Sequence, residues 1–313
     1  MQSFFHSVSA VLVILLLTAT GYFLGRIGYI RQEHKGMITK LAINVGLPCL
    51  CLNNLTDYFT RASLAEAGRM LLVPLGVILL LSALGALAAR LLRLPHRQRG
   101  VFIVMCAFSN SVFIGMPMCM ELFGEAATPY VMCYYLVNTG LFQTLGIALL
   151  DWSGKPKGER GGLWQNAKGL LKKPPLIALA ASLALIWFDI PLPGVVMSYT
   201  KYMGALVSPL GLIYTGYVIY EHGLRNIRLE RGLPGMLGVR FLLSPAATLA
   251  GCALLGMRGL ARGVFLVEAT MPTMTQTVVL SAMLGADEDY AALGAALSTL
   301  ASFGVIPVLM LLL

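Results

Sequence analysis

The chain has 313 residues, of which 58% are hydrophobic and only 12% are charged, and its mean hydropathy is +0.78. Soluble globular proteins are about half apolar and about a quarter charged, so the composition excludes a soluble fold and predicts an integral membrane protein. The formal net charge of +9 would suggest nucleic-acid binding in a soluble protein. Here the placement of the basic residues in loops accounts for it, and no nucleic-acid partner is expected.

Ten apolar runs are long enough to cross a bilayer, which takes roughly 20 residues per helix. The expected spans are 7–27, 37–58, 67–91, 99–122, 127–150, 174–190, 197–221, 233–256, 262–284 and 290–312. The first run has no Lys or Arg before it and is too long for a signal peptide, so it is interpreted as a span. The pattern predicts an all-α membrane protein surrounded by lipid.

Basic residues concentrate in alternate loops between these spans. The richer loops cover 26–40, 90–99, 155–173 and 225–231, whereas the opposite loops hold only Arg61, Arg69, Lys201, Arg258 and Arg262. Cytoplasmic loops carry the excess of Lys and Arg. The expected location is therefore the cell inner membrane, with multiple passes and both termini on the outer, periplasmic side.

The chain resembles one five-span unit used twice. A polar stretch at 151–173, interpreted as a cytoplasmic linker, separates a first repeat at 1–150 from a second at 174–313. Matching segments at one constant offset are Thr39-Lys40 with Thr200-Lys201, Pro48 with Pro209, and 122–124 with 283–285. Because each unit has an odd number of spans, the second copy enters the membrane from the opposite side. Inverted repeats of this kind are found mainly in secondary transporters.

Spans four and nine are each interrupted by polar residues and a proline. The candidate substrate-binding residues at these breaks are Ser109, Asn110, Ser111, Gly115 and Pro117 in the fourth span, and Pro272, Thr273, Thr275, Gln276 and Thr277 in the ninth. Broken helices persist in a membrane only where protein or a wet cavity satisfies the freed backbone groups. Each break also brings the positive end of a half-helix to mid-membrane. We expect the breaks to cross and bind a small anion such as a carboxylate; a pair of ordinary proline kinks is the alternative.

Glu268 lies four residues before Pro272 and is the only acidic residue deep in a span. A charge there costs several kcal/mol unless it is paired or hydrated. The residue is therefore a coupling candidate, as a proton carrier or as an anchor for a cation. The alternative is a structural carboxylate paired with Arg262 or with a polar neighbour.

Four further residues are weaker candidates for the cavity: Asn44, Pro48, Pro209 and Arg240. The two prolines are interpreted as kinks in a supporting frame, and Asn44 as part of the cavity wall. Arg240 is expected to extend its side chain to the cytoplasmic surface rather than to contact the substrate.

Neither a metal site, a cofactor nor a catalytic centre is expected. The six cysteines lie inside predicted spans with no CxxC pair and no His at ligand spacing, which is typical of small buried hydrophobes. The four histidines fall at span edges, and no Ser-His or Asp-His pair lies within a span. An intramembrane enzyme acting on lipid stays as a less favoured alternative.

Three segments resemble the auxin efflux carrier family, which includes plant PIN-type carriers and bacterial malonate and malate permeases. Asn110, Gly115 and Pro117 fit a fourth-span pattern N-x-x-x-x-G-x-P; 240–246 is similar to an eighth-span R-F-L-x-x-P-A, and 208–212 to a seventh-span P-L-G-L. The resemblance covers nearly the whole chain in span order. Two features depart from it: the central linker is short compared with the long loop of plant members, and Glu268 is not part of the family pattern.

The resemblance implies two inverted five-helix repeats with broken, crossing helices four and nine. It implies a scaffold of spans 1, 2, 6 and 7, a moving transport domain of spans 3–5 and 8–10, and a homodimer formed through the scaffold. It also implies that Asn110 contacts the substrate carboxylate. The expected function is a secondary active transporter of a small mono- or dicarboxylate that works by an elevator-type mechanism, with a proton as the possible coupling ion. A sodium-coupled symporter of the related bile-acid type is the alternative.

Overall fold

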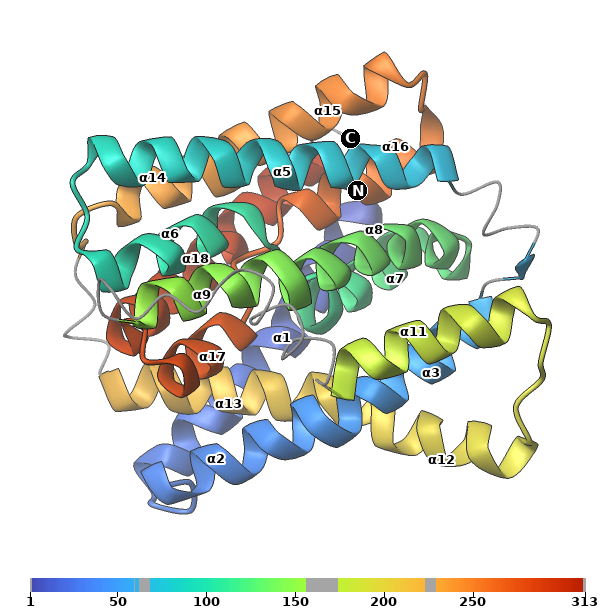
Figure 1. Ribbon diagram of the computed structural model, residues 1–313, viewed down its shortest axis with the longest axis horizontal. Coiled ribbons are helices and arrows are strands. Elements are labelled where there is room, and N and C mark those ends of the chain that lie inside the picture. Colours follow the sequence, from blue (N-terminus) through green and yellow to red (C-terminus); the bar gives the residue numbers. More distant parts are fainter. Residues whose placement is uncertain (1, 59, 62–67, 156–173, 223–228, 312–313) are drawn as a thin grey trace.

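The computed structural model describes residues 2–58, 60–61, 68–155, 174–222 and 229–311. Within these ranges the chain is helical apart from short connections, and most helices run roughly along the long axis of the molecule (Figure 1). Six helical segments of the described part are long and apolar enough to cross a membrane: 32–53, 68–91, 129–154, 194–221, 233–254 and 288–306. The protein is thus a multi-pass helical membrane protein.

The helices before the predicted linker follow the order of the first five expected spans. They are α1 (Gln2–Arg26), α2 (Gln32–Leu41), the π-helical turn η1 (Ala42–Gly46), α3 (Leu47–Tyr58), α5 (Gly68–Leu91), α6 (His96–Ala107), the π-helical turn η2 (Ser111–Gly115), α7 (Met116–Phe123), the 3₁₀ turn η3 (Glu125–Ala127), α8 (Thr128–Leu141), the π-helical turn η4 (Phe142–Gly146) and α9 (Ile147–Gly154). From residue 156 on, the predicted linker lies outside the described residues.

The helices after the linker follow the order of the last five expected spans. They are α11 (Pro174–Trp187), α12 (Gly194–Ala205), α13 (Val207–His222), α14 (Leu233–Gly238), the π-helical turn η6 (Val239–Leu243), α15 (Ser244–Leu254), α16 (Gly259–Ala269), α17 (Gln276–Leu284) and α18 (Glu288–Leu311). Spans four and nine each consist of two separate helices, α6 with α7 and α16 with α17.

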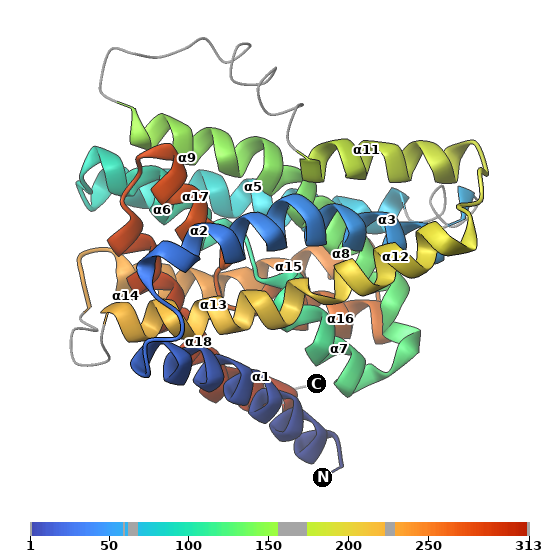
Figure 2. The ribbon, with the colours of Figure 1, turned by 90° about the horizontal axis from the view of Figure 1, so that it is seen from below.

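Helices of the two halves pack against each other through small residues. A Cβ at Gly21 of α1 would overlap the carbonyl oxygen of Ile213 on α13, and one at Gly216 of α13 would overlap that of Thr18 on α1. Glycines at a helix contact let the two backbones approach closely. Elsewhere in the molecule, α3 lies against α11 and α12 (Figures 1 and 2).

A second group of helices surrounds an aromatic core. Phe108, where span four breaks, packs edge-on against Phe142 at 5.5 Å between ring centroids, and Tyr134 of α8 packs against Phe265 of α16 at 6.0 Å. All four rings are buried. Such edge-to-face pairs add to the energy of burial, so spans four, five and nine form one packed unit.

The helix α5 is apolar on all sides. Its inner face buries Val77, Ile78 and Leu81, whereas Leu80 and Leu87 on its outer face are about half exposed. A helix that is hydrophobic all round needs an apolar environment on every face. The outer face of α5 therefore suits lipid contact.

Three prolines inside spans follow π-helical turns. Pro48, Pro117 and Pro245 are each the second residue of an α-helix whose preceding turn is η1, η2 or η6. A proline ring clashes with the carbonyl four residues earlier, and a wider π turn moves that carbonyl aside. Pro209 instead lies in the first turn of α13, where a missing N–H costs no helical bond.

An ion-pair network joins three helices at one end of the bundle. The ammonium nitrogen of Lys35 on α2 lies 2.7 Å from a carboxylate oxygen of Glu221 on α13 and 2.8 Å from one of Glu288 at the start of α18. All three side chains are at least two-thirds shielded from solvent. The network connects span 10 with spans 2 and 7.

Candidate functional site

The two interrupted spans meet at their breaks. The backbone N–H of Asn110 donates to the carbonyl oxygen of Pro272 at 2.8 Å, and that of Met274 donates to the carbonyl of Phe108 at 3.3 Å. These bonds form an isolated antiparallel bridge between Ser109 and Thr273. The breaks therefore meet in space, and main-chain atoms hold them together.

Arg240 binds the carbonyl groups that the breaks leave unpaired. Its Nε donates to Met271 O at 2.9 Å, and its two terminal nitrogens donate to Cys106 O at 3.0 Å and Ala269 O at 2.9 Å. The last carbonyls of a helix lack intrahelical donors. The guanidinium thus caps both α6 and α16 with charge-assisted bonds.

This position contradicts the expectation that Arg240 extends to the cytoplasmic surface. The side chain is fully buried, at 0% exposure. The sequence pattern missed this role because the acceptors are carbonyls of other spans. In a continuous helix the N–H of Asn110 would donate to the carbonyl oxygen of Cys106, four residues earlier. Only the tertiary structure shows that this N–H donates to Pro272 O instead, which leaves Cys106 O for the arginine.

The Asn110 side chain belongs to a buried polar chain that crosses between helices. Its Nδ2 donates to Thr275 Oγ1 at 2.9 Å, and Thr215 Oγ1 on α13 donates to the same oxygen at 3.3 Å. Each of these residues is at most 6% exposed. The chain connects both breaks to span seven, and Thr215 was not among the residues predicted from the sequence.

Asn138 on α8 fixes the first break. Its Nδ2 donates to Ser109 O at 2.9 Å and to Ser111 Oγ at 3.0 Å, and its Oδ1 accepts the N–H of Ser109 at 3.3 Å. On the other break, the N–H of Thr273 donates to Ser298 Oγ on α18 at 3.2 Å. A polar amide within an apolar span is the sequence signal that could have identified Asn138.

The remaining predicted residues of the ninth span follow the crossing directly. Gln276 and Thr277 open α17, and both are buried. Gln276 Oε1 and Thr277 Oγ1 have no hydrogen-bond partner among the described residues. Buried polar atoms are normally paired, so these oxygens mark a place where a ligand or water can bind.

Glu268 is the penultimate residue of α16, and its side chain packs behind the first break. Its carboxylate fits against Gly115, where an added Cβ would come within 2.5 Å of Oε2, and Cys119 Sγ donates to Oε1 at 3.7 Å. Oε2 has no hydrogen-bond partner among the described residues, and the side chain is 0% exposed. No ion pair with Arg262 occurs in the described part of the chain, and Arg262 itself is exposed.

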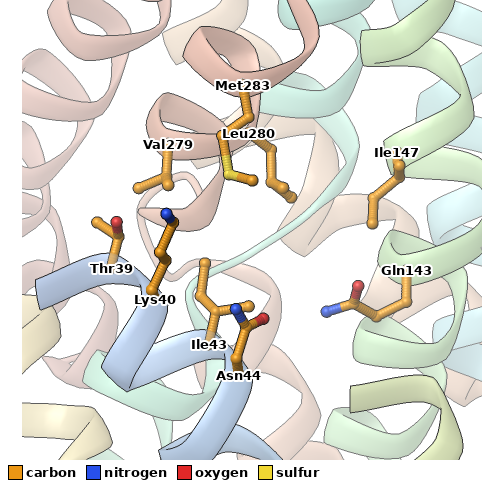
Figure 3. A pocket seen from close by; sticks show the side chains of 9 residues that line it. All are labelled: Thr39, Lys40, Ile43, Asn44, Gln143, Ile147, Val279, Leu280 and Met283. Carbon is orange, nitrogen blue, oxygen red and sulfur yellow. The ribbon is translucent and has the colours of Figure 1, made fainter. Parts of the chain in front are cut away.

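Two adjoining cavities lie beside the crossing, between span two and spans five, seven and nine. The first, of about 40 Å³, is lined by Thr39, Lys40, Ile43, Asn44, Gln143, Ile147, Val279, Leu280 and Met283 (Figure 3). The second, of about 20 Å³, is lined by Ile38, Thr39, Ala42, Ile43, Leu210, Gly211, Tyr214, Thr275, Gln276 and Val279. Asn44 lines the first cavity, whereas Pro48, Pro209 and Arg240 do not line either one.

The described residues contain no cluster of three or more His, Cys, Asp or Glu side chains that could hold a metal ion. All six cysteines are buried and unpaired as free thiols. The groups available at the crossing are therefore amides, hydroxyls and backbone groups that form hydrogen bonds, together with the buried Arg240 guanidinium and the buried Glu268 carboxylate.

Interrupted membrane helices that cross around buried polar groups are typical of secondary transporters, and the comparisons with known proteins agree. The profile of the family described as "Membrane transport protein" matches residues 6–161 and 163–310. The chain belongs to this family, the auxin efflux carrier family that its motifs resemble.

Two archaeal proteins are similar over nearly the whole chain. An uncharacterized transporter of Methanothermobacter thermautotrophicus is 28% identical over 311 residues, which cover 97% of each protein. An uncharacterized transporter of Methanocaldococcus jannaschii is 25% identical over 284 residues, or 88% of this chain and 89% of the relative. The family indicates a transporter rather than an enzyme.

Proposed function

We propose that the protein is a secondary active transporter of a small organic anion, a mono- or dicarboxylate, in the inner membrane. Two inverted five-helix repeats would form it, with spans 3–5 and 8–10 moving as a transport domain past a scaffold of spans 1, 2, 6 and 7. Both termini would face the periplasm, and the scaffold would form a homodimer. The observation that carries the proposal is the hydrogen-bonded crossing of the two broken spans.

The crossing offers donors to an anion. The first residues of α17 point the positive end of a helix dipole toward the break, and Asn110 Nδ2 is a neutral donor placed between the two breaks. In a low-dielectric site such groups bind a carboxylate without requiring a buried counter-charge. Binding would replace the bond between Asn110 and Thr275 with bonds to the substrate.

Coupling is needed for uptake, because a negative-inside membrane favours anion export by about 2.3 kcal/mol per charge per 100 mV. Glu268 is the proposed proton carrier. Its Oε2 has no partner among the described residues, so the site has room for a proton without displacing an ion pair. Loss of uptake when choline replaces sodium would instead favour a sodium-coupled symporter.

The binding role is tested with Asn110→Ala in proteoliposomes that contain a radiolabelled carboxylate for counterflow. We expect at least a tenfold loss of transport, because the donor lies at the crossing. Thr144→Ala on the exposed face of η4, which bonds only within its own helix, is the matched control. Transport by Asn110→Ala at the parent's affinity and rate would refute the proposed site.

The coupling role is tested with Glu268→Gln in the same liposomes. The variant should lose pH-driven accumulation while it retains exchange of substrate across the membrane. Accumulation that keeps the parent's dependence on the pH gradient would remove Glu268 from the mechanism.

A further inference from the structure

The larger cavity beside the crossing has an unusual balance of charge. Of the nine residues that line it, Lys40 is the only charged one, and no acidic side chain faces it. No ion pair of Lys40 occurs in the described part of the chain. A cation at the edge of a membrane span without a counter-charge favours the binding of an anion.

A buried amide on the opposite wall has an unused donor. Gln143 on η4 is 2% exposed, and its Nε2 has no hydrogen-bond partner among the described residues. Figure 3 shows this nitrogen pointing from span five toward Asn44, while the Lys40 side chain extends away from span two toward Val279 of α17. Leaving a buried donor unpaired is unfavourable, so the arrangement suits an acceptor that enters the cavity.

The size of the cavity limits the acceptor to a small group. A volume of about 40 Å³ has room for roughly three water molecules, given the ~10–15 Å³ that each requires. A carboxylate group has three heavy atoms. The apolar walls formed by Ile43, Ile147 and Leu280 offer no hydrogen bonds. The polar groups of the lining are those of Thr39, Lys40, Asn44 and Gln143.

The cavity continues toward the crossing. It shares Thr39, Ile43 and Val279 with the smaller cavity, which is also lined by Thr275 and Gln276. An anion held at Lys40 therefore has its other end directed toward the break residues. This arrangement suits a molecule with an acidic group at each end.

We propose that Lys40, with Gln143 and Asn44, forms a second anion subsite that selects dicarboxylates over monocarboxylates. The inference rests on the proposed function and adds the substrate class to it. One carboxylate binds the Lys40 ammonium and the Gln143 amide, and the other binds at the crossing near Asn110. A substrate with a neutral amide in place of the second carboxylate lacks the attraction to the Lys40 ammonium and binds more weakly.

The test compares each dicarboxylate with its own monoamide, which has nearly the same size but one charge fewer. Full-length protein in proteoliposomes is assayed by counterflow with malonate, succinate and glutarate and with their monoamides. The parent should transport at least one dicarboxylate with a kcat/KM at least tenfold above that of its monoamide. Lys40→Gln should reduce this ratio to within threefold of one, and Lys40→Arg should preserve the preference.

The matched control is Lys201→Gln, because Lys201 occupies the corresponding place in the second repeat and is exposed on α12 without lining either cavity. It should keep the parent's ratio. If Lys40→Gln does not fold, as judged by gel filtration and thermal unfolding, Gln143→Leu tests the same cavity from its other wall and should reduce the ratio as well.

The outcomes separate this inference from the proposed function. The subsite is overturned if the parent transports dicarboxylates and monoamides equally well, or if Lys40→Gln keeps the parent's ratio of kcat/KM values. This holds even where Asn110→Ala abolishes transport of both substrates. If Lys40→Gln loses the preference for the dicarboxylate over its monoamide while Asn110→Ala transports at the parent's rate, the subsite is supported and the crossing site is refuted. Absence of any carboxylate transport refutes both.

Discussion

Arg240 provides the sharpest test of how the broken spans are stabilised. In Arg240→Met a flexible apolar side chain replaces the guanidinium and fills much of its volume. The carbonyls of Cys106 and Met271 then lose the arginine donors at 3.0 and 2.9 Å, whereas Ala269 O keeps the Ser244 hydroxyl at 2.9 Å. Two buried carbonyls are left unpaired, each costing about 1–3 kcal/mol, for a sum of roughly 4 kcal/mol.

The expected result is a large fall in thermal stability. At roughly 2 °C per kcal/mol, the value for larger domains, the loss corresponds to about 8 °C in Tm. Purified variants are compared by thermal unfolding in the same detergent. Arg262→Met, at an exposed position of α16, is the control and should stay within about 2 °C of the parent. A Tm of Arg240→Met equally close to the parent would show that the carbonyls at the breaks do not depend on this cap.

Two further substitutions address contacts around the site. Gly115→Ala places a methyl group within 2.5 Å of the Glu268 carboxylate. Overpacking should cost about 1–3 kcal/mol of stability and lower the Tm. Adding Glu268→Ala should restore the Tm, and a double variant no more stable than Gly115→Ala would contradict the contact. Lys35→Met and Glu288→Gln should show non-additive losses of Tm, with a coupling of about 1 kcal/mol expected for this partly shielded pair; strictly additive losses, measured by the same thermal unfolding, would mean that the ion pair does not join span 10 to span 2.

The positions of the two breaks could be predicted from the sequence because polar residues and a proline within an apolar run are costly unless they have a purpose. The exact point of breakage could not. The chain leaves the helix at Phe108, and Pro117 lies beyond the break in the first turn of α7, because the π-helical turn η2 accommodates the proline. Proline therefore marks the neighbourhood of the break rather than its centre.

Contacts between spans were beyond the sequence. Arg240 and Asn138 act on backbone groups of the breaks, and nothing in their own neighbourhood of the chain records which carbonyl or N–H loses its helical partner. In the sequence, Lys40 was noted as part of a basic loop and of the match with Thr200-Lys201, and was not a candidate for the site. Its place opposite Gln143 depends on how span two packs against span five, and no local pattern encodes that packing.

The junction of spans four and nine is made of backbone N–H and C=O groups, and every amino acid except proline supplies both. The junction therefore depends on few particular side chains besides Arg240 and Asn138, which bind backbone groups of the breaks. Most side-chain substitutions at the junction therefore leave its hydrogen-bonding groups in place. Substitutions in the cavity walls can therefore change which substrate is bound while the backbone hydrogen bonds between the two breaks are kept.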